Sequence, residues 1–116
     1  MRPPLSLAAL ALLAVAPTVS MQAQTMARRS DLQAGHTLAV HACAGCHVVE
    51  ADPRFRPPVP YGPSFFDVAS KPDTTEQSLQ AFLGQPHPRG RMPYPDLSSS
   101  EVAEVSAYIL SLRGRR

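Results

Sequence analysis

The stretch "HACAGCHVVE", residues 41–50, contains both cysteines of the chain and decides how the rest of the sequence is interpreted. Cys43 and Cys46 are three positions apart, and His47 directly follows the second of them. Cysteine pairs of this spacing occur as disulfides, as redox dithiols, as parts of zinc sites and as attachment points for a larger group. Each of these uses requires different surroundings along the chain.

A helix is predicted directly before the cysteine pair. Ser30 and Gln33 have the spacing of a capping box, in which two side chains bond each other's backbone at a helix start. Small and apolar residues then recur at helical spacing as far as Cys43. These residues are Leu32, Gly35, Leu38, Ala39 and Ala42. The two histidines of this segment, His36 and His41, are expected to face solvent or to pack against loops.

A second, shorter helix is predicted to begin at Thr74, with Gln77 as its capping partner. It is expected to run for about three turns and to stop at Gly84. Its apolar face consists of Leu79, Phe82 and Leu83.

The third predicted helix has the clearest signals. It lies in "LSSSEVAEVSAYILSLR", residues 97–113, where Ser98 and Glu101 repeat the capping pattern and Gly114 follows the end. Its apolar stripe consists of Val102, Val105, Ile109 and Leu112.

Thirteen prolines limit what the rest of the chain can form. Most lie between Pro53 and Pro95, where they exclude long helices and any central strand, so we expect loops there. No stretch alternates polar and apolar residues as a strand does, and the predicted class is therefore all-α. A domain this small, with no Trp, often needs a disulfide, a metal or a cofactor to complete its core.

The N-terminus has the layout of a secretory signal peptide. Arg2 gives a positive start, and the apolar run from Leu5 to Ala16 is shorter than the about 20 residues that cross a bilayer. We expect a signal peptide at residues 1–23, cleaved after residue 23 to 27, and a folded domain at residues 30–113. An uncleaved membrane anchor is the alternative.

The charge of the chain argues against a nucleic-acid partner. Its net charge is +2, and removal of Arg2 with the signal peptide lowers it to +1. A nucleic-acid surface requires basic residues clustered on one face. The arginine pairs at residues 28–29 and 115–116 are instead explained as solvated ends of the domain.

Three interpretations of the cysteine pair need features that the sequence lacks. A disulfide between Cys43 and Cys46 would close a very short loop, and disulfide stabilisation grows with loop length. A redox dithiol usually lies at a helix N-terminus in a βαβ unit, whereas this pair follows a helix end. Zinc needs four N or S ligands, and besides His47 only His41 or His87 could supply the fourth, without any supporting spacing.

The pattern C-x-x-C-H at residues 43–47 is the attachment signature of c-type haem. Thioether bonds from Cys43 and Cys46 would hold one edge of the porphyrin and bring the imidazole of His47 under the iron. An export signal strengthens this interpretation, because c-type haem is attached after export.

A second axial ligand is then required, and Met92 is the methionine that lies well inside the domain, with prolines close to it on the C-terminal side. A histidine and a methionine together are a standard ligand pair for haem iron. His87, five residues earlier on the same segment, is the competing candidate. Its imidazole would lower the reduction potential and favour a sensor over a carrier.

Four stretches occur in a familiar order: "LAVHACAGCH", "YGPSFFDVA", "LQAFLGQPHPRGRMP" and "LSSSEVAEVSAYILSLR". Together they resemble the small class I cytochromes c, monohaem proteins of bacterial periplasms, over residues 30–113. The resemblance implies that the N- and C-terminal helices cross, and that a short middle helix and proline-rich loops wrap around one haem c.

The resemblance also implies roles for individual residues. Gly35 and Tyr108 would mark the crossing of the two terminal helices, and the Pro63 carbonyl would accept the Nδ1 proton of His47. Mitochondrial relatives dock through a ring of lysines, but this chain has only Lys71, so we expect arginines to contribute to docking instead. These are Arg54, Arg56, Arg89 and Arg91.

Function follows from the expected ligands. Two strong protein ligands leave iron no open position for a substrate, so we expect one-electron transfer and not an enzyme. The expected protein is a monomeric periplasmic carrier, without a membrane span after cleavage, whose redox partners are a membrane complex, a dehydrogenase or an oxidase. The alternatives are a haem subunit of a dehydrogenase complex and a ligand-switching haem sensor.

Overall fold

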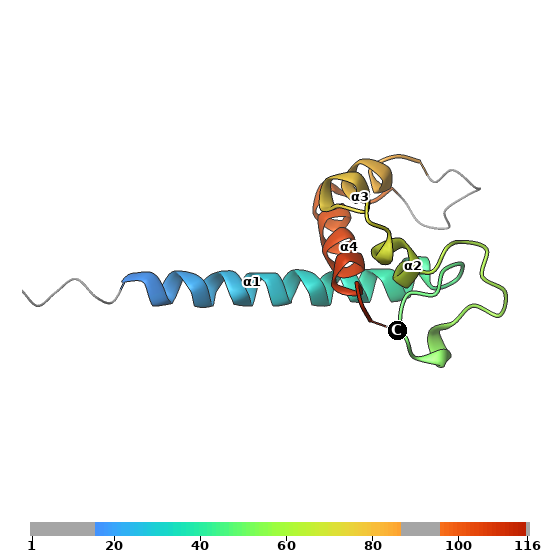
Figure 1. Cartoon of the computed structure of the whole chain (residues 1–116), viewed down its shortest axis with the longest axis horizontal. Coiled ribbons are helices and arrows are strands. Elements are labelled where there is room, and N and C mark those ends of the chain that lie inside the picture. The colour runs from blue at the N-terminus through green and yellow to red at the C-terminus, as the bar shows by residue number, and fades with distance from the viewer. Residues whose placement is uncertain (1–15, 87–95, 116) are drawn as a thin grey trace, which may run out of the picture.

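Helices form all of the regular structure in the described part of the chain, and no strand is present there. The computed structural model describes residues 16–86 and 96–115, and Figure 1 shows their arrangement. The elements are α1 (Ala16–Leu38), a π-helical turn (Ala39–Cys43), a 3-10 turn (Pro53–Phe55), α2 (Phe65–Ser70), α3 (Glu76–Leu83) and α4 (Ser99–Ser111). The predicted all-α class is confirmed.

The first helix begins earlier than its sequence pattern predicts. Because α1 runs through Ser30 without interruption, the predicted start at Ser30 and Gln33 is wrong. Residues 18–34 contain no glycine or proline that would stop a helix, and Pro17 lies in the first turn, where proline is tolerated. Residues 20–31 are exposed, and this half of α1 projects away from the other helices in Figure 1. The packed part of α1 therefore begins near Leu32.

The signal peptide predicted at residues 1–23 falls mostly outside the described ranges and stays a prediction. Its last residues, 16–23, form the start of α1. Within the described ranges, none of the helices combines the length and the apolar character needed to cross a membrane.

The helices α1 and α4 cross where a glycine allows their backbones to meet. A Cβ atom placed on Gly35 would lie 2.0 Å from the backbone oxygen of Glu104 and 3.0 Å from the Cβ of Tyr108. Ala39, one turn after Gly35, and Val105, next to Glu104, have no exposed surface. The predicted crossing at Gly35 and Tyr108 is therefore confirmed, and Figure 1 shows α4 lying across α1.

The core collects apolar side chains from α2, α3 and α4, from the π-helical turn after α1 and from the segment after the cysteine motif. Its buried members are Ala39, Val49, Phe65, Ala69, Leu79, Val105, Tyr108, Ile109 and Leu112. Four of these nine residues lie on or directly after α4, so this helix is the element against which the others pack.

The middle of the chain contains a helix that the sequence pattern did not predict. α2 begins after Ser64, whose hydroxyl oxygen accepts a hydrogen bond from the N–H of Phe66. A serine before an apolar run is a helix-start signal. The helix is only six residues long, which is too short for a helical period to be visible in the sequence.

α3 begins one residue later than predicted. Its capping box consists of Thr75 and Ser78, not of Thr74 and Gln77. Thr74 is instead buried, and its hydroxyl donates to a carbonyl oxygen of α2 at 2.7 Å. The helix has eight residues, about two turns, and ends at Gly84 as predicted.

The predicted capping box of α4 is confirmed. The hydroxyl oxygen of Ser98 accepts from the backbone N–H of Glu101, and the carboxylate of Glu101 accepts from the backbone N–H of Ser98 at 2.7 Å. Hydrogen bonds from the hydroxyl and the backbone of Ser98 lower the pKa of Glu101. The carboxylate is therefore ionised at neutral pH and contributes to the cap in that form.

We expect Ser98→Ala to lower the free energy of unfolding by about 1 kcal/mol, the usual cost of losing a serine cap. Urea unfolding of the haem-loaded protein, followed by circular dichroism, measures this change. The hydrogen bonds from Ser98 favour the ionised carboxylate of Glu101, so its pKa is lower in the folded than in the unfolded chain. The resulting stabilisation is present above the pKa of the unfolded chain and is lost as the pH falls through the pKa of the folded state. The difference between wild type and variant should therefore shrink in acid. An equal difference at neutral and acidic pH would contradict this account of the cap.

Candidate functional site

The cysteine motif forms a tight turn at the end of the first helix. The π-helical turn that follows α1 ends at Cys43, close to the predicted helix end. The backbone N–H groups of Cys46 and His47 then both donate to the carbonyl oxygen of Cys43, at 3.1 and 2.9 Å. Both cysteines are thiols and not a disulfide. The turn keeps the two thiols and the imidazole of the motif on one short, ordered piece of chain.

The environment of the cysteines does not suit a redox dithiol. Cys43 is partly buried against the core, whereas Cys46 is exposed. Burial, together with the neighbouring Cys46, raises the pKa of the Cys43 thiol to about 11. A reactive dithiol needs a lowered pKa, because the thiolate is the nucleophile.

The imidazole of His47 is oriented by a backbone carbonyl. Its Nδ1 donates a hydrogen bond to the carbonyl oxygen of Pro63 at 2.7 Å, the contact that the family resemblance implied. Because that carbonyl can only accept, the proton of the neutral ring lies on Nδ1 and the ring lone pair lies on Nε2. The ring also packs near Phe65, with 5.5 Å between ring centroids. His47 therefore has one preferred tautomer and one preferred ring direction.

Backbone hydrogen bonds join the loop that carries Pro63 to the cysteine motif. The N–H groups of Tyr61 and Gly62 both donate to the carbonyl oxygen of Cys46, at 3.0 and 3.1 Å. Gly62 lies directly against the imidazole, since a Cβ atom there would be 2.1 Å from Cε1 of His47. The motif does not reveal this requirement for glycine, because it arises from a contact across 15 residues.

We expect Gly62→Ala to displace the His47 ring and to weaken its hydrogen bond to Pro63. A methyl group cannot occupy a position 2.1 Å from Cε1, so either the ring or the loop has to move, at an expected cost of about 1–3 kcal/mol. NMR of the His47 ring protons in the haem-loaded protein, combined with urea unfolding, measures both effects. Gly45→Ala is the matched control, because a Cβ atom at Gly45 meets no atom within 4 Å. Unchanged ring resonances in Gly62→Ala would contradict the contact.

The residues of this site fit a covalently attached haem. Two thiols and an imidazole with its lone pair on Nε2 are the donors that such a group requires. The proposed second ligand Met92 and its competitor His87 lie outside the described residues, as do Arg89 and Arg91.

The two described docking candidates differ in their surroundings. Arg54 makes hydrogen bonds to both carboxylate oxygens of Asp52, and these bonds lower the pKa of Asp52 to about 2. Its guanidinium group also lies 5.9 Å from the ring centroid of Phe55. Arg56 is exposed on the same loop. The charge of Arg54 is thus balanced locally by Asp52.

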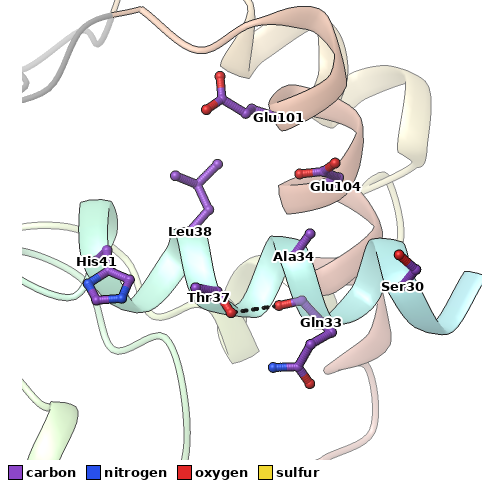
Figure 2. A pocket seen from close by; sticks show the side chains of 8 residues that line it. All are labelled: Ser30, Gln33, Ala34, Thr37, Leu38, His41, Glu101 and Glu104. Carbon is purple, nitrogen blue, oxygen red and sulfur yellow. Dashed lines mark hydrogen bonds between the residues drawn. The ribbon is translucent and has the colours of Figure 1, made fainter.

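A shallow groove of about 550 Å³ lies between α1 and α4 and extends to His41 in the π-helical turn. Figure 2 shows its lining side chains, among them His41 at one end and Glu101 and Glu104 on α4. Neither cysteine nor His47 lines this groove. His41 is exposed, as predicted.

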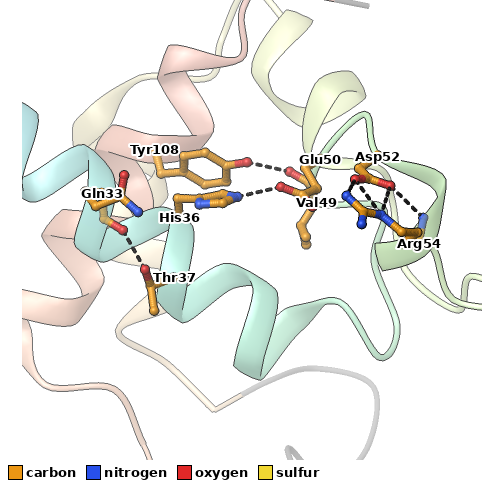
Figure 3. Close-up of polar contacts among 8 residues, drawn as sticks. All are labelled: Gln33, His36, Thr37, Val49, Glu50, Asp52, Arg54 and Tyr108. Carbon is orange, nitrogen blue, oxygen red and sulfur yellow. Dashed lines mark hydrogen bonds and ion pairs between the residues drawn. The ribbon is translucent and has the colours of Figure 1, made fainter.

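His36 pairs with a loop residue, Glu50, in agreement with the predicted packing against loops, but it also contacts α4. It is only partly exposed, and its ring packs against Tyr108 of α4, with 5.1 Å between the ring centroids. Its Nε2 pairs with the carboxylate of Glu50, and Tyr108 donates to the carbonyl oxygen of Val49 (Figure 3). Burial, with the nearby charge of Glu50, raises the pKa of Tyr108 to about 12, so the hydroxyl remains protonated. No sequence signal links His36 to Glu50, because they meet only in the tertiary structure.

An all-helical domain that crosses its terminal helices at a glycine and presents a C-x-x-C-H turn with an oriented histidine defines the class of c-type cytochromes. Residues 32–113 match the sequence model of the family described as Cytochrome c. The chain is also 40% identical over 91 residues to cytochrome c-552 of Bradyrhizobium diazoefficiens, an alignment that covers 72% of this chain and 77% of the relative. The chain belongs to the cytochrome c family. No solved structure gives a significant match.

Membership of this family defines the cofactor and the general activity. Members carry covalent haem c, for which the cysteine turn of this chain has the required pattern, and they act with redox partners as electron carriers. The family resemblance drawn from the sequence motifs is confirmed.

Proposed function

We propose that the protein is exported to the periplasm and carries single electrons on one haem c. In this proposal Cys43 and Cys46 form the thioether bonds, and His47 and Met92 are the axial ligands of the iron. The observation that best supports it is the hydrogen bond from Nδ1 of His47 to Pro63, since it directs Nε2 toward a metal. The apolar start of the sequence supports export.

The protein's own residues prepare this site before any electron moves. Pro63 holds the tautomer of His47, Gly62 leaves room for the ring, and Phe65 packs beside it. When bound, haem supplies an iron that cycles between the ferrous and ferric states. Held in this way, His47 should change little between the two states, and the chain contributes orientation and an apolar surrounding to the transfer.

The choice of the second ligand affects the reduction potential. A methionine sulfur raises the potential relative to a second imidazole. If His47 and Met92 both bind the iron, no position would be left for a substrate or for oxygen, which favours a carrier over a haem enzyme or a gas sensor.

The proposed partners are redox proteins, either a membrane complex, a dehydrogenase or an oxidase. The chain is close to neutral, so long-range attraction to a partner would be weak and short-range contacts would determine docking. Exposed Arg56 can contribute to such contacts, whereas Arg54 is already paired with Asp52. We propose that the mature protein is a monomer.

The decisive test compares Met92→Ala with His87→Ala in protein secreted by a host that attaches c-type haem. Ferric haem with histidine and methionine ligands has a weak far-red absorption band. We expect Met92→Ala to abolish this band and to lower the potential, because the iron loses its sulfur ligand. His87→Ala should leave the band in place. Absence of the band from the haem-loaded wild-type protein would instead make His87 or an open site the better assignment and would favour a sensor.

A further inference from the structure

Three consecutive residues directly after His47 are each held by a different helix. The carbonyl oxygen of Val48 accepts from the backbone N–H of Phe65, at the start of α2, at 2.9 Å. The carbonyl oxygen of Val49 accepts from the hydroxyl of Tyr108 on α4, also at 2.9 Å. The side chain of Glu50 pairs with His36 on α1. The segment that carries His47 is thus anchored at three successive points.

The third anchor is a directed contact. Nε2 of His36 lies 2.5 Å from Oε2 of Glu50, and since a carboxylate oxygen accepts, the imidazole N–H is the donor. The Glu50 side chain is only 17% exposed and that of His36 34% exposed. The tilted contact with the Tyr108 ring restricts the directions that the imidazole of His36 can take.

These features separate the pair from an ordinary surface ion pair. Exposed ion pairs contribute little, because solvent screens them and two mobile side chains have to be ordered. Here the side chain of Glu50 is nearly buried and that of His36 is already held by Tyr108, so forming the pair costs less side-chain conformational entropy. Figure 3 shows the two contacts side by side, His36 with Glu50 and Tyr108 with Val49.

We propose that His36 is a positioning residue for the iron ligand His47, acting through its hydrogen bond to Glu50. The inference rests on the proposed function, in which His47 binds the iron. Val49 is fully buried and held from one side by Tyr108. The His36 contact holds the next residue, so the chain cannot rotate about the Val49 anchor and move His47 relative to Pro63. Without the His36 contact, segment 48–50 opens locally more often, while the rest of the fold stays intact.

The test measures hydrogen exchange in the ferrous, haem-loaded protein by NMR. The reporter is the backbone amide of Phe65, which donates to Val48, and amides in the middle of α4 report global opening. We expect His36→Leu to accelerate exchange of the Phe65 amide about tenfold more than that of the α4 amides, the size expected for loss of a hydrogen bond to a charged group. His36→Gln should restore slow exchange, because its amide can still donate to Glu50.

Two matched controls complete the design. His41→Leu makes the same change at an exposed histidine on the same helical stretch and should leave the Phe65 amide unchanged. Ser98→Ala lowers global stability at a distant cap and should accelerate all of these amides together. The double variant His36→Leu/Glu50→Ala should exchange no faster than His36→Leu alone, because both changes remove the same contact.

Each outcome has one meaning. Selective acceleration at Phe65 that His36→Gln reverses supports the proposal. Uniform acceleration, as in Ser98→Ala, or no acceleration overturns it, since His36 would then contribute only general stability or nothing. The Soret band of the wild-type protein tests the proposed function separately. If no haem is attached, there is no iron ligand to position and both proposals fail.

Discussion

The double variant Cys43→Ser/Cys46→Ser is expected to contain no covalently bound haem. A hydroxyl group does not form the thioether that links a cysteine to the porphyrin edge, and these two residues are the only cysteines of the chain. The measurement is haem staining after a denaturing gel, together with the spectrum of the acid-denatured protein, where noncovalent haem is lost. The expected change is from one haem per chain to none.

Gly45→Ala is the matched control for this experiment. It changes the same turn between the two cysteines, but the added Cβ atom meets nothing within 4 Å and Gly45 does not have a positive φ. It should therefore keep its haem. Covalent haem in the double serine variant would show that these cysteines are not the attachment points.

Gly35→Ala is expected to cost about 3 kcal/mol of unfolding free energy or more. The new Cβ atom would lie 2.0 Å from the backbone oxygen of Glu104, and a backbone atom cannot rotate away as a side chain can. The helices α1 and α4 would have to separate, which loosens the packing around Ala39 and Val105. Overpacking of this kind costs 1–3 kcal/mol and sometimes more. The better helix propensity of alanine returns only about 1 kcal/mol.

Urea unfolding of the haem-loaded variant measures this loss, again with Gly45→Ala as the control. A domain of this size has a total stability at the lower end of about 5–15 kcal/mol, so the midpoint should fall far below that of the wild type. A loss of less than 1 kcal/mol in Gly35→Ala would mean that the crossing can widen without strain.

Local signals in the sequence were enough to predict the elements with strong helix signals. The capping box of Ser98 and Glu101 lies within four residues, and the structure contains it as predicted. The other two predicted starts were wrong for different reasons. Ser30 competes with a long run of helix-forming residues before it, and Thr74 competes with Thr75 for the same role. A short-range pattern shows that a cap can form, but not which of two candidates the packing favours.

The sequence alone determined the all-α class, the C-x-x-C-H turn and the family, because these depend on residue types at fixed short spacings. Only the tertiary structure decided that Gly62 has to be small, that the ring of His36 packs on Tyr108, and that Glu50 is its partner. Those contacts join residues 14 to 72 positions apart. They exist because the helices bring distant side chains within a few ångströms of one another, and no local pattern of the chain encodes that distance.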